Sequence, residues 1–344
     1  MKILTIVVPV YNVEKYLDQC LKSFVISEIL DKLEVLIVND GSCDSSSTIG
    51  QTYVNKYPDT FRMITKENGG HGSTINVGIQ EATGKYFKVV DGDDWVTAKG
   101  VKSLVKLMAD LDVDMVLSNY YWVDDITGKK SKEIKEICSG IEYGTVIPFQ
   151  MVSSKIFFKM HAITYRTEIL KKIPERIDEH CYYVDLEYIT FPIPYIKTIA
   201  AIPDYVYMYR VGQATQSVSI ENMQKRCTQH EKVVNCLLKY FDQNRSVTNE
   251  IKDCMAEIIA RSVTSQYKIY LSFKESHKKD IIHFEKILKE KYYDIYAKIN
   301  NPAIDILRLT NYIAYDLLSI VVRFAVKGIK DNNHTIYNSW SKIK

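Results

Sequence analysis

Over its first 120 residues, the chain alternates short apolar runs with segments whose apolar residues recur at helical spacing. The run Ile3–Val8 is apolar except for Thr5 and the run Leu33–Val38 is apolar except for Glu34, which is typical of strands covered on both faces. In Glu14–Val25, the apolar residues instead fall on one helical face. Repeated strand–helix–strand units with short connections favour an α/β fold with a mostly parallel, doubly wound sheet. We predict further strands over Phe61–Thr65, Lys85–Val90 and Asp114–Ser118, and further helices from Asp44, over Ser73–Glu81 and over Ala98–Ala109.

The pattern changes after this region. Residues 120–144 predict a charged hairpin or loop, and residues 145–220 mix short helices with strands such as Ala200–Arg210. From residue 221 onward, helix follows helix, with few breakers before Asn300–Pro302. We therefore expect an α/β domain over residues 1–220 and an α-helical C-terminal region over residues 221–344.

Composition and charge exclude several classes of protein. The 344 residues, 46% hydrophobic and 25% charged, are ordinary for a globular chain of about two domains. The net charge is +3, but residues 221–344 carry 21 Lys and Arg against 14 Asp and Glu, whereas residues 1–220 are slightly acidic. This near-neutral N-terminal part argues against a nucleic-acid partner. The basic C-terminal region either faces an acidic surface such as phospholipid head groups or forms a solvated helical face.

Seven cysteines without a CxxC pair or zinc-ligand spacing are typical of reduced thiols in a cytoplasmic protein. The segment Met1–Val10 faintly resembles a signal peptide, but its apolar run is short and no small-residue cleavage site follows. We interpret it as a first strand. No stretch is long and apolar enough to predict a transmembrane helix.

Three polar clusters follow predicted strands: Pro9–Asn12, Asn39–Ser42 and Asp91–Asp94. Ligands of open parallel sheets bind beyond the carboxyl ends of the strands, so we expect these clusters to meet at one edge. Three carboxylates within four residues suit a hard cation such as Mg²⁺ or Mn²⁺, which would neutralise a diphosphate. The alternative is a helix N-cap or an acidic turn, because aspartate is favoured at the start of the following helix.

The segment Asn68–Thr74 is a glycine-rich loop that enters a helix. Backbone amides at a helix N-terminus can hold a phosphate, although no Walker motif is present. The alternative is a flexible connection.

Together, these motifs resemble family 2 glycosyltransferases with the GT-A fold. The resemblance rests on Val7–Asn12, Leu36–Ser42, Gly84–Tyr86 and Asp91–Asp94, and it covers roughly residues 1–210 in order. It implies an inverting enzyme that uses nucleotide-diphosphate sugars with Mn²⁺ or Mg²⁺. It also implies that residues 1–120 bind the nucleotide-sugar and residues 120–220 the acceptor.

The resemblance assigns roles to individual residues. Pro9, Tyr11 and Asp40 would hold the nucleobase, and a carboxylate that accepts from uracil N3–H favours UDP. Asp93 would be the principal metal ligand, assisted by Asp91. The remaining donor-site residues are Asn68 and Asp91 at the ribose and sugar, Gly92 within the acidic turn, and Asp94 close to the donor sugar.

One position departs from the family pattern. The family usually has an arginine near the diphosphate where this chain has Ile75. Either His71 and the loop amides replace it, or a cation arrives from elsewhere, for which Arg210 is the best candidate. The alternative for Arg210 is a surface arginine at a strand end.

The family places an aspartate at a helix start as the general base that takes the acceptor hydroxyl proton. Asp185 fits this position, although Val184 replaces the usual glutamate. Weaker candidates for the base are His180, His161 and Glu187, and the acceptor is expected near His161 and Arg166.

We therefore predict transfer from a UDP-sugar to a saccharide or lipid-linked acceptor, in cell-surface polysaccharide or glycoconjugate biosynthesis. The alternative function is a non-catalytic nucleotide-sugar-binding or scaffold protein. A sugar-phosphate nucleotidyltransferase would need a basic glycine-rich loop over Thr5–Tyr16, and a processive synthase would need Gln-x-x-Arg-Trp and transmembrane helices. Neither set of features is present.

The C-terminal segment Ala303–Lys330 predicts a helix with a narrow polar stripe and a wide apolar arc. So wide an arc must pack against other helices of the region, form a homodimer, or lie peripherally on the inner face of the cell membrane. The stripe comprises Asp305, Arg308, Tyr312, Asp316, Ser319, Arg323, Lys327 and Lys330, and the arc comprises Ile306, Leu309, Ile313, Leu317, Leu318, Ile320, Val321, Phe324 and Val326.

Overall fold

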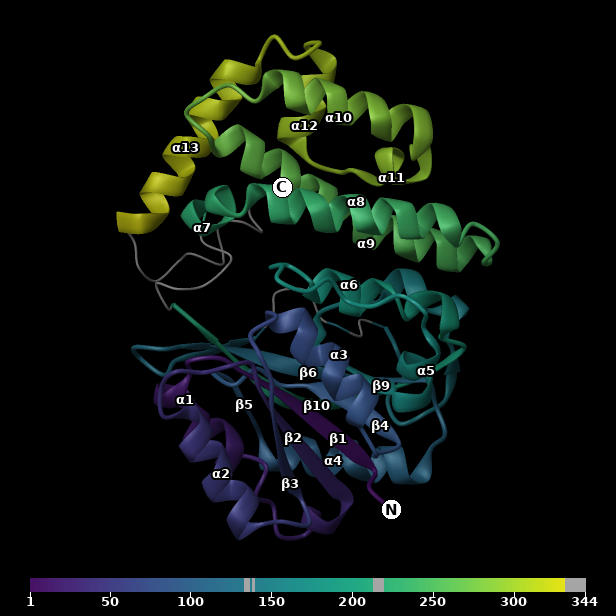
Figure 1. Cartoon of the computed structure of the whole chain (residues 1–344). Helices are drawn as coiled ribbons and strands as arrows, with labels where there is room; N and C mark the ends of the chain where they lie inside the picture. The colour runs from purple at the N-terminus through teal and green to yellow at the C-terminus, as the bar shows by residue number, and fades with distance from the viewer. Residues whose placement is uncertain (133–136, 138–139, 213–219, 332–344) are drawn as a thin grey trace. The chain divides into compact units, whose positions relative to one another are not determined.

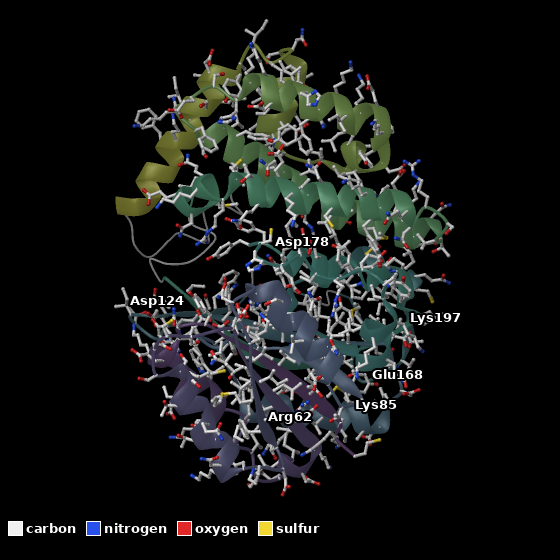
Figure 2. The ribbon with its side chains drawn as sticks, viewed as in Figure 1. Arg62, Lys85, Asp124, Glu168, Asp178 and Lys197 are labelled. Atoms are coloured by element: carbon white, nitrogen blue, oxygen red, sulfur yellow. The ribbon has the colours of Figure 1, made fainter. Side chains whose placement is uncertain are left out.

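The structure is a computed structural model that describes residues 1–132, 137, 140–212 and 220–331. The chain folds as two compact units, Met1–Gln213 and Ala214–Lys344 (Figure 1). Charged side chains such as Arg62, Glu168 and Lys197 are exposed on the first unit (Figure 2).

The first unit is built on one mixed sheet with the strand order β3-β2-β1-β4-β9-β6-β10-β5. Strands β1 to β4 are parallel to their neighbours within that group, and β6 is parallel to β10, as predicted. The strand β9 lies antiparallel between β4 and β6, and β5 is antiparallel to β10. The strands are β1 Leu4–Val10, β2 Leu33–Asn39, β3 Phe61–Thr65, β4 Tyr86–Val89, β5 Trp95–Val96, β6 Met115–Asp124, β7 Lys130–Lys132, β8 Ile147–Pro148, β9 Ile163–Arg166 and β10 Thr198–Val211.

Every residue of β1 and β2 is buried, because helices cover both faces of these apolar strands. The predicted strand Asp114–Ser118 is longer than expected, since β6 continues to Asp124 and pairs with β7 in the charged hairpin. The helices of the first unit are α1 Glu14–Lys22, α2 Ser46–Lys56, α3 His71–Glu81, α4 Ala98–Asp110, α5 Thr167–Lys172 and α6 Asp185–Thr190.

The second unit is helical, as predicted. The helices α8 and α9 pack side by side (Figure 1), and α9 is buried along most of its length. Among the described residues, no helix combines the length and hydropathy needed to cross a bilayer. The helices are α7 Ile220–Lys225, α8 Cys227–Gln243, α9 Asn249–Ser272, α10 Lys278–Lys291, α11 Tyr293–Lys298, α12 Pro302–Leu309 and α13 Tyr315–Asp331.

The single helix predicted over Ala303–Lys330 is wrong, because the chain breaks between α12 and α13. Asn311 and Tyr312 adopt φ values of 47° and 62°, and the Tyr312 N–H donates to the Leu307 carbonyl at 2.7 Å. This bond closes α12 in a left-handed C-terminal turn, a conformation that asparagine tolerates.

Of the three alternatives for the apolar arc, packing within the C-terminal region is wrong for most of its described residues. Leu309, Ile313, Leu317 and Phe324 are 85%, 79%, 65% and 69% exposed. The polar stripe instead turns inward in part: Ser319 is buried, Arg308 pairs with Glu285, and Arg323 donates to the Phe273 carbonyl. The side chains of Val326, Lys327 and Lys330 lie outside the described residues.

A close contact joins α3 to the segment that precedes α6. A Cβ on Gly72 would lie 2.1 Å from the carbonyl oxygen of Asp178. One turn later, the Asn76 amide donates to the Ile177 carbonyl at 2.8 Å and accepts from the Ile177 N–H at 3.1 Å. The N-terminal turn of α3 is thereby fastened to a segment about 100 residues away in sequence.

We predict that Gly72→Ala lowers the free energy of unfolding of the first unit by about 1–3 kcal/mol, because the added methyl meets backbone that cannot easily move. Urea denaturation followed by circular dichroism measures this change. Gln80→Ala, at an exposed position of the same helix, is the control and should unfold like the wild type. Equal stability of both variants would contradict the contact.

Candidate functional site

The loops that follow β1 and β2 are joined by hydrogen bonds. The Asn12 N–H donates to Ser42 Oγ at 3.1 Å, and the Cys43 N–H donates to Asn12 Oδ1 at 2.8 Å. Tyr11 is half exposed at this edge, whereas Pro9 is buried in the strand end. The expected meeting of the first two polar clusters is therefore present.

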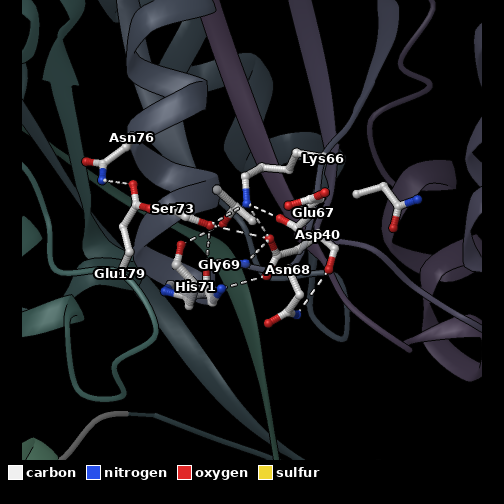
Figure 3. A network of polar contacts seen from close by, with 12 residues as sticks. Asp40, Lys66, Glu67, Asn68, Gly69, His71, Ser73, Asn76 and Glu179 are labelled. Carbon is white, nitrogen blue, oxygen red and sulfur yellow. Dashed lines mark hydrogen bonds and ion pairs between the residues drawn. The ribbon is translucent and has the colours of Figure 1, made fainter.

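Asp40 organises the glycine-rich loop (Figure 3). Its carboxylate is buried and accepts from the N–H groups of Gly69 and Gly70 at 2.9 and 2.8 Å, and from Lys66 Nζ at 2.7 Å. Asn68 donates to the Asp40 carbonyl at 3.1 Å. The protein itself thus satisfies the buried carboxylate, and the contact of Asp40 with a nucleobase stays a prediction.

The acidic turn Asp91–Asp94 is pressed against β1. The Gly92 N–H donates to the Pro9 carbonyl at 3.2 Å, and a Cβ on Gly92 would lie 2.9 Å from that oxygen. Glycine therefore allows the turn to lie this close to the strand. The alternative that the acids cap the next helix is wrong, because Thr97 is the N-cap of α4 and accepts from the Gly100 N–H.

Asp94 is the most deeply buried carboxylate of the turn. Its two oxygens accept from the Tyr207 hydroxyl at 2.6 Å and from the Arg210 N–H at 2.7 Å, and the Asp91 N–H donates to Tyr207 Oη at 3.1 Å. Burial, together with the charges of Asp93 and Asp91, raises the pKa of Asp94 well above its usual range. A cation would favour the charged form of such a carboxylate.

A metal-compatible group of atoms lies at this turn. Asp91, Asp94 and His161 each offer one ligand atom, and these atoms lie within 4.8 Å of one another. Carboxylate oxygens with one imidazole nitrogen fit a divalent cation. Asp93 does not belong to this group, so its role as principal ligand stays a prediction.

His71 opens α3 and contacts the same turn, with Nε2 at 2.7 Å from Asp91 Oδ1. Burial lowers the pKa of His71, but Asp91 outweighs this effect, with smaller contributions from Asp185 and Asp93, and the pKa is raised. The glycine-rich loop therefore presents an imidazole among carboxylates. Ile75, on the next turn of α3, is fully buried.

Asp185 begins α6 and is partly buried. Burial raises the pKa of its carboxyl, while His71 and Lys159 oppose the rise. A raised pKa suits a general base. Of the weaker candidates for the base, Glu187 is fully buried and accepts from the Asp178 N–H at 2.8 Å, whereas His180 is exposed.

Arg210 is not the surface residue of the alternative interpretation, because only 8% of it is exposed. Its guanidinium donates to the Asp93 carbonyl at 2.7 Å, to Asp125 at 2.8 Å and to Gln19 at 2.7 Å. Arg210 thereby supports the acidic turn from β10. Contact of Arg210 with a diphosphate stays a prediction.

Two residues beneath the site were not predicted from the sequence. Lys88 is buried in β4, where Nζ donates to the carbonyls of His161 and Ile163 at 2.8 and 3.1 Å, and burial lowers its pKa to about 7. A lysine within the apolar run Lys85–Val90 was the available signal. Tyr207, which bridges the acidic turn to β10, carried no such signal, because tyrosines are abundant in this chain.

Comparison with known proteins agrees with this geometry. The family model described as Glycosyl transferase family 2 matches residues 5–174. The chain is 35% identical over 125 residues to glycosyltransferase GlyA of Streptococcus pneumoniae serotype 4. The aligned region covers 36% of this chain and 18% of GlyA. It is 26% identical over 213 residues to the minor teichoic acid biosynthesis protein GgaB of Bacillus subtilis, which covers 61% of this chain and 23% of GgaB. The chain thus spans only a minor part of either relative.

Solved structures show the fold. S. aureus TarS 1–349 in complex with UDP-GlcNAc is similar with a TM-score of 0.64 and 17% identity, over 96% of this chain and 92% of that one. The mannosyltransferase PcManGT from Pyrobaculum calidifontis, in complex with GDP-Man and Mn²⁺, has a TM-score of 0.53 and 15% identity, over 93% and 86% of the two chains. The predicted GT-A-type sheet with a helical C-terminal region is confirmed. Through residues 5–174, the chain belongs to glycosyl transferase family 2.

Proposed function

We propose that this protein is an inverting glycosyltransferase that moves a sugar from a UDP-sugar to a saccharide or lipid-linked acceptor. The observation that carries the proposal is the contact of His71 with Asp91, together with the electrostatic influence of Asp185 on His71. This arrangement brings the acidic turn, the glycine-rich loop and the expected base to one edge of the sheet. The similar fold of TarS, which was solved in complex with UDP-GlcNAc, supports a UDP-sugar donor.

The donor would lie across the strand ends. Pro9, Tyr11 and Asp40 would face the nucleobase, and Asn68, Asp91, Gly92 and Asp94 would face the ribose and sugar. Arg210 donates to the Asp93 carbonyl, and this contact would place its guanidinium near the diphosphate. Each of these roles can be tested by substitution of the residue.

Asp93 and Asp91 would hold Mn²⁺ or Mg²⁺. A divalent cation at such a site stabilises the negative charge of a departing diphosphate. The PcManGT structure, which contains Mn²⁺, supports this choice. Burial and the charges of Asp93 and Asp91 raise the pKa of Asp94, and a nearby cation would favour its charged form.

Asp185 would accept the proton of the acceptor hydroxyl. The freed oxygen attacks the anomeric carbon from the face opposite the diphosphate, so that one C–O bond forms as the other breaks and the configuration inverts. The contacts of Gly72 and Asn76 with the segment before α6 keep Asp185 beside the glycine-rich loop. Partial burial limits the water that could compete with the acceptor.

The acceptor proposal rests on the relatives. GgaB is named for teichoic acid biosynthesis, and we infer a cell-surface polysaccharide or related glycoconjugate as the product. Such synthesis would take place in the cytoplasm, at the inner face of the membrane.

The first test is release of UDP from a panel of UDP-sugars with Mn²⁺ or Mg²⁺. We predict metal-dependent release by the wild type, and loss of at least 100-fold in Asp93→Asn, because the variant keeps the shape of the side chain and loses its charge. Asp59→Asn, an exposed carboxylate before β3, is the control and should retain activity. No turnover with any UDP-sugar and acceptor would favour the non-catalytic alternative.

The second test concerns the base. Asp185→Asn should lower kcat by about 10²–10⁴-fold with little change in the Kd for UDP, since Asp185 acts on the acceptor. In the wild type, activity should decline as the pH falls through the raised pKa of Asp185, because the protonated carboxyl cannot accept a proton. This decline should disappear in the variant, whereas Glu168→Gln on the surface of α5 should preserve it. Near-normal turnover of Asp185→Asn would reject Asp185 as the base.

We also propose that the exposed apolar face of α12 and α13 binds an anionic lipid surface. Its exposed apolar residues are Ile306 and Leu309 on α12, Ile313 in the turn between the helices, and Leu317, Ile320, Val321 and Phe324 on α13. The excess of basic residues in 221–344 complements anionic head groups. This binding would bring the enzyme to a lipid-linked acceptor.

Co-sedimentation with vesicles of anionic phospholipid tests whether this apolar face binds lipid. We predict that Leu317→Glu and Phe324→Glu reduce binding at least tenfold, whereas Ile282→Glu, at a partly exposed apolar position on α10, leaves it unchanged. No vesicle binding by the intact chain at low salt would reject the proposal, and a dimer in sedimentation equilibrium that Phe324→Glu dissociates would assign the face to a second copy.

A further inference from the structure

His161 borders the acidic turn, and the sequence indicated it only as a weaker candidate for the base near the expected acceptor site. It lies in the short turn Met160–Ala162 that leads into β9, and the packing of several aromatic side chains fixes its ring. The imidazole stacks on Tyr209 with centroids 4.1 Å apart and meets the edge of Tyr207 at 4.7 Å. Its carbonyl accepts from the buried Lys88. Both the backbone and the ring of His161 are therefore held in place.

The polar atoms of the ring are not all used by the protein. Nδ1 of His161 is buried and has no hydrogen-bond partner within the described residues. A buried polar atom without a partner is costly, and a bound ion or water would complete it. The packing that fixes the ring therefore holds an imidazole whose hydrogen-bonding capacity is incompletely used.

The position of the ring is suitable for a metal. One ring nitrogen and one oxygen each from Asp91 and Asp94 lie within 4.8 Å of one another. Ligands at about 2.0–2.3 Å from one ion lie at most about 4.6 Å apart, so the three atoms need to move only slightly to share a cation. They come from two segments: the acidic turn Asp91–Asp94 and the short turn Met160–Ala162 that precedes β9.

We propose that His161 is a nitrogen ligand of the divalent cation, together with Asp91 and Asp94. This inference rests on the proposed function, in which a metal serves the donor diphosphate, and it adds a ligand from the acceptor half of the unit. Imidazole is a good ligand for transition metals, whereas Mg²⁺ prefers oxygen. The site should therefore favour Mn²⁺ over Mg²⁺, and the segment that carries the acceptor site would be anchored to the metal.

The experiment uses electron paramagnetic resonance of the full chain with Mn²⁺, alone and with UDP. Titration of the free-ion signal gives the affinity, and electron spin echo modulation from ¹⁴N detects a directly bound imidazole. We expect ¹⁴N modulation in the wild type and its loss in His161→Phe, which keeps the ring stack but removes the nitrogens. Mn²⁺ affinity should fall at least tenfold in this variant, and His283→Phe, an exposed histidine on α10, should behave as the wild type.

The outcomes separate this inference from the proposed function. Mn²⁺ bound with oxygen ligands only, or ¹⁴N modulation that persists in His161→Phe, would overturn the role of His161 and leave the proposed metal in place. Failure of the wild type to bind Mn²⁺ even with UDP would overturn the metal itself. If near-ultraviolet circular dichroism shows that His161→Phe is unfolded, His161→Gln provides the same measurement with an amide in place of the imidazole.

Discussion

Two hydrogen bonds to the buried carboxylate of Asp94 join the acidic turn to β10. Their donors, the Tyr207 hydroxyl and the Arg210 N–H, lie more than 100 residues further along the chain. The Tyr207 hydroxyl oxygen also accepts a hydrogen bond from the Asp91 N–H, and the Arg210 guanidinium donates to the Asp93 carbonyl. The turn cannot relax away from the strand ends without breaking several of these bonds at once.

This constraint has an electrostatic consequence. Asp91, Asp93, Asp94 and Asp185 are kept close enough to influence the same histidine or one another, and burial penalises the charges of Asp91, Asp94 and Asp185. The raised pKa of Asp94 and the raised pKa of His71 are two responses to the same crowding of negative charge. Such a cluster is unfavourable for stability and suits a ligand that brings positive charge.

The second junction of the unit is between α3 and the segment before α6. Gly72 permits backbone contact with Asp178, and the Asn76 amide satisfies both polar groups of the Ile177 backbone. Asp40 holds the loop that enters α3 through its amides (Figure 3). The loop is therefore held between the end of β2 and the segment before α6, which brings the residues proposed for the donor and for the acceptor to one edge.

Local pattern by itself determined the core of this protein. Predominantly apolar runs identified β1 and β2, because strands buried on both faces carry few polar residues, and the clusters that follow them indicated the edge where the proposed site residues gather. The position of Asp185 at a helix start was likewise visible in the sequence. Only the tertiary structure decided the burial of Arg210 and the antiparallel insertion of β9 between β4 and β6. It also decided the placement of Lys88 and His161 beneath the acidic turn and the solvent exposure of the apolar face of α13. These features depend on contacts between residues far apart in the chain, and the periodicity of a segment indicates which face is apolar but not what that face meets.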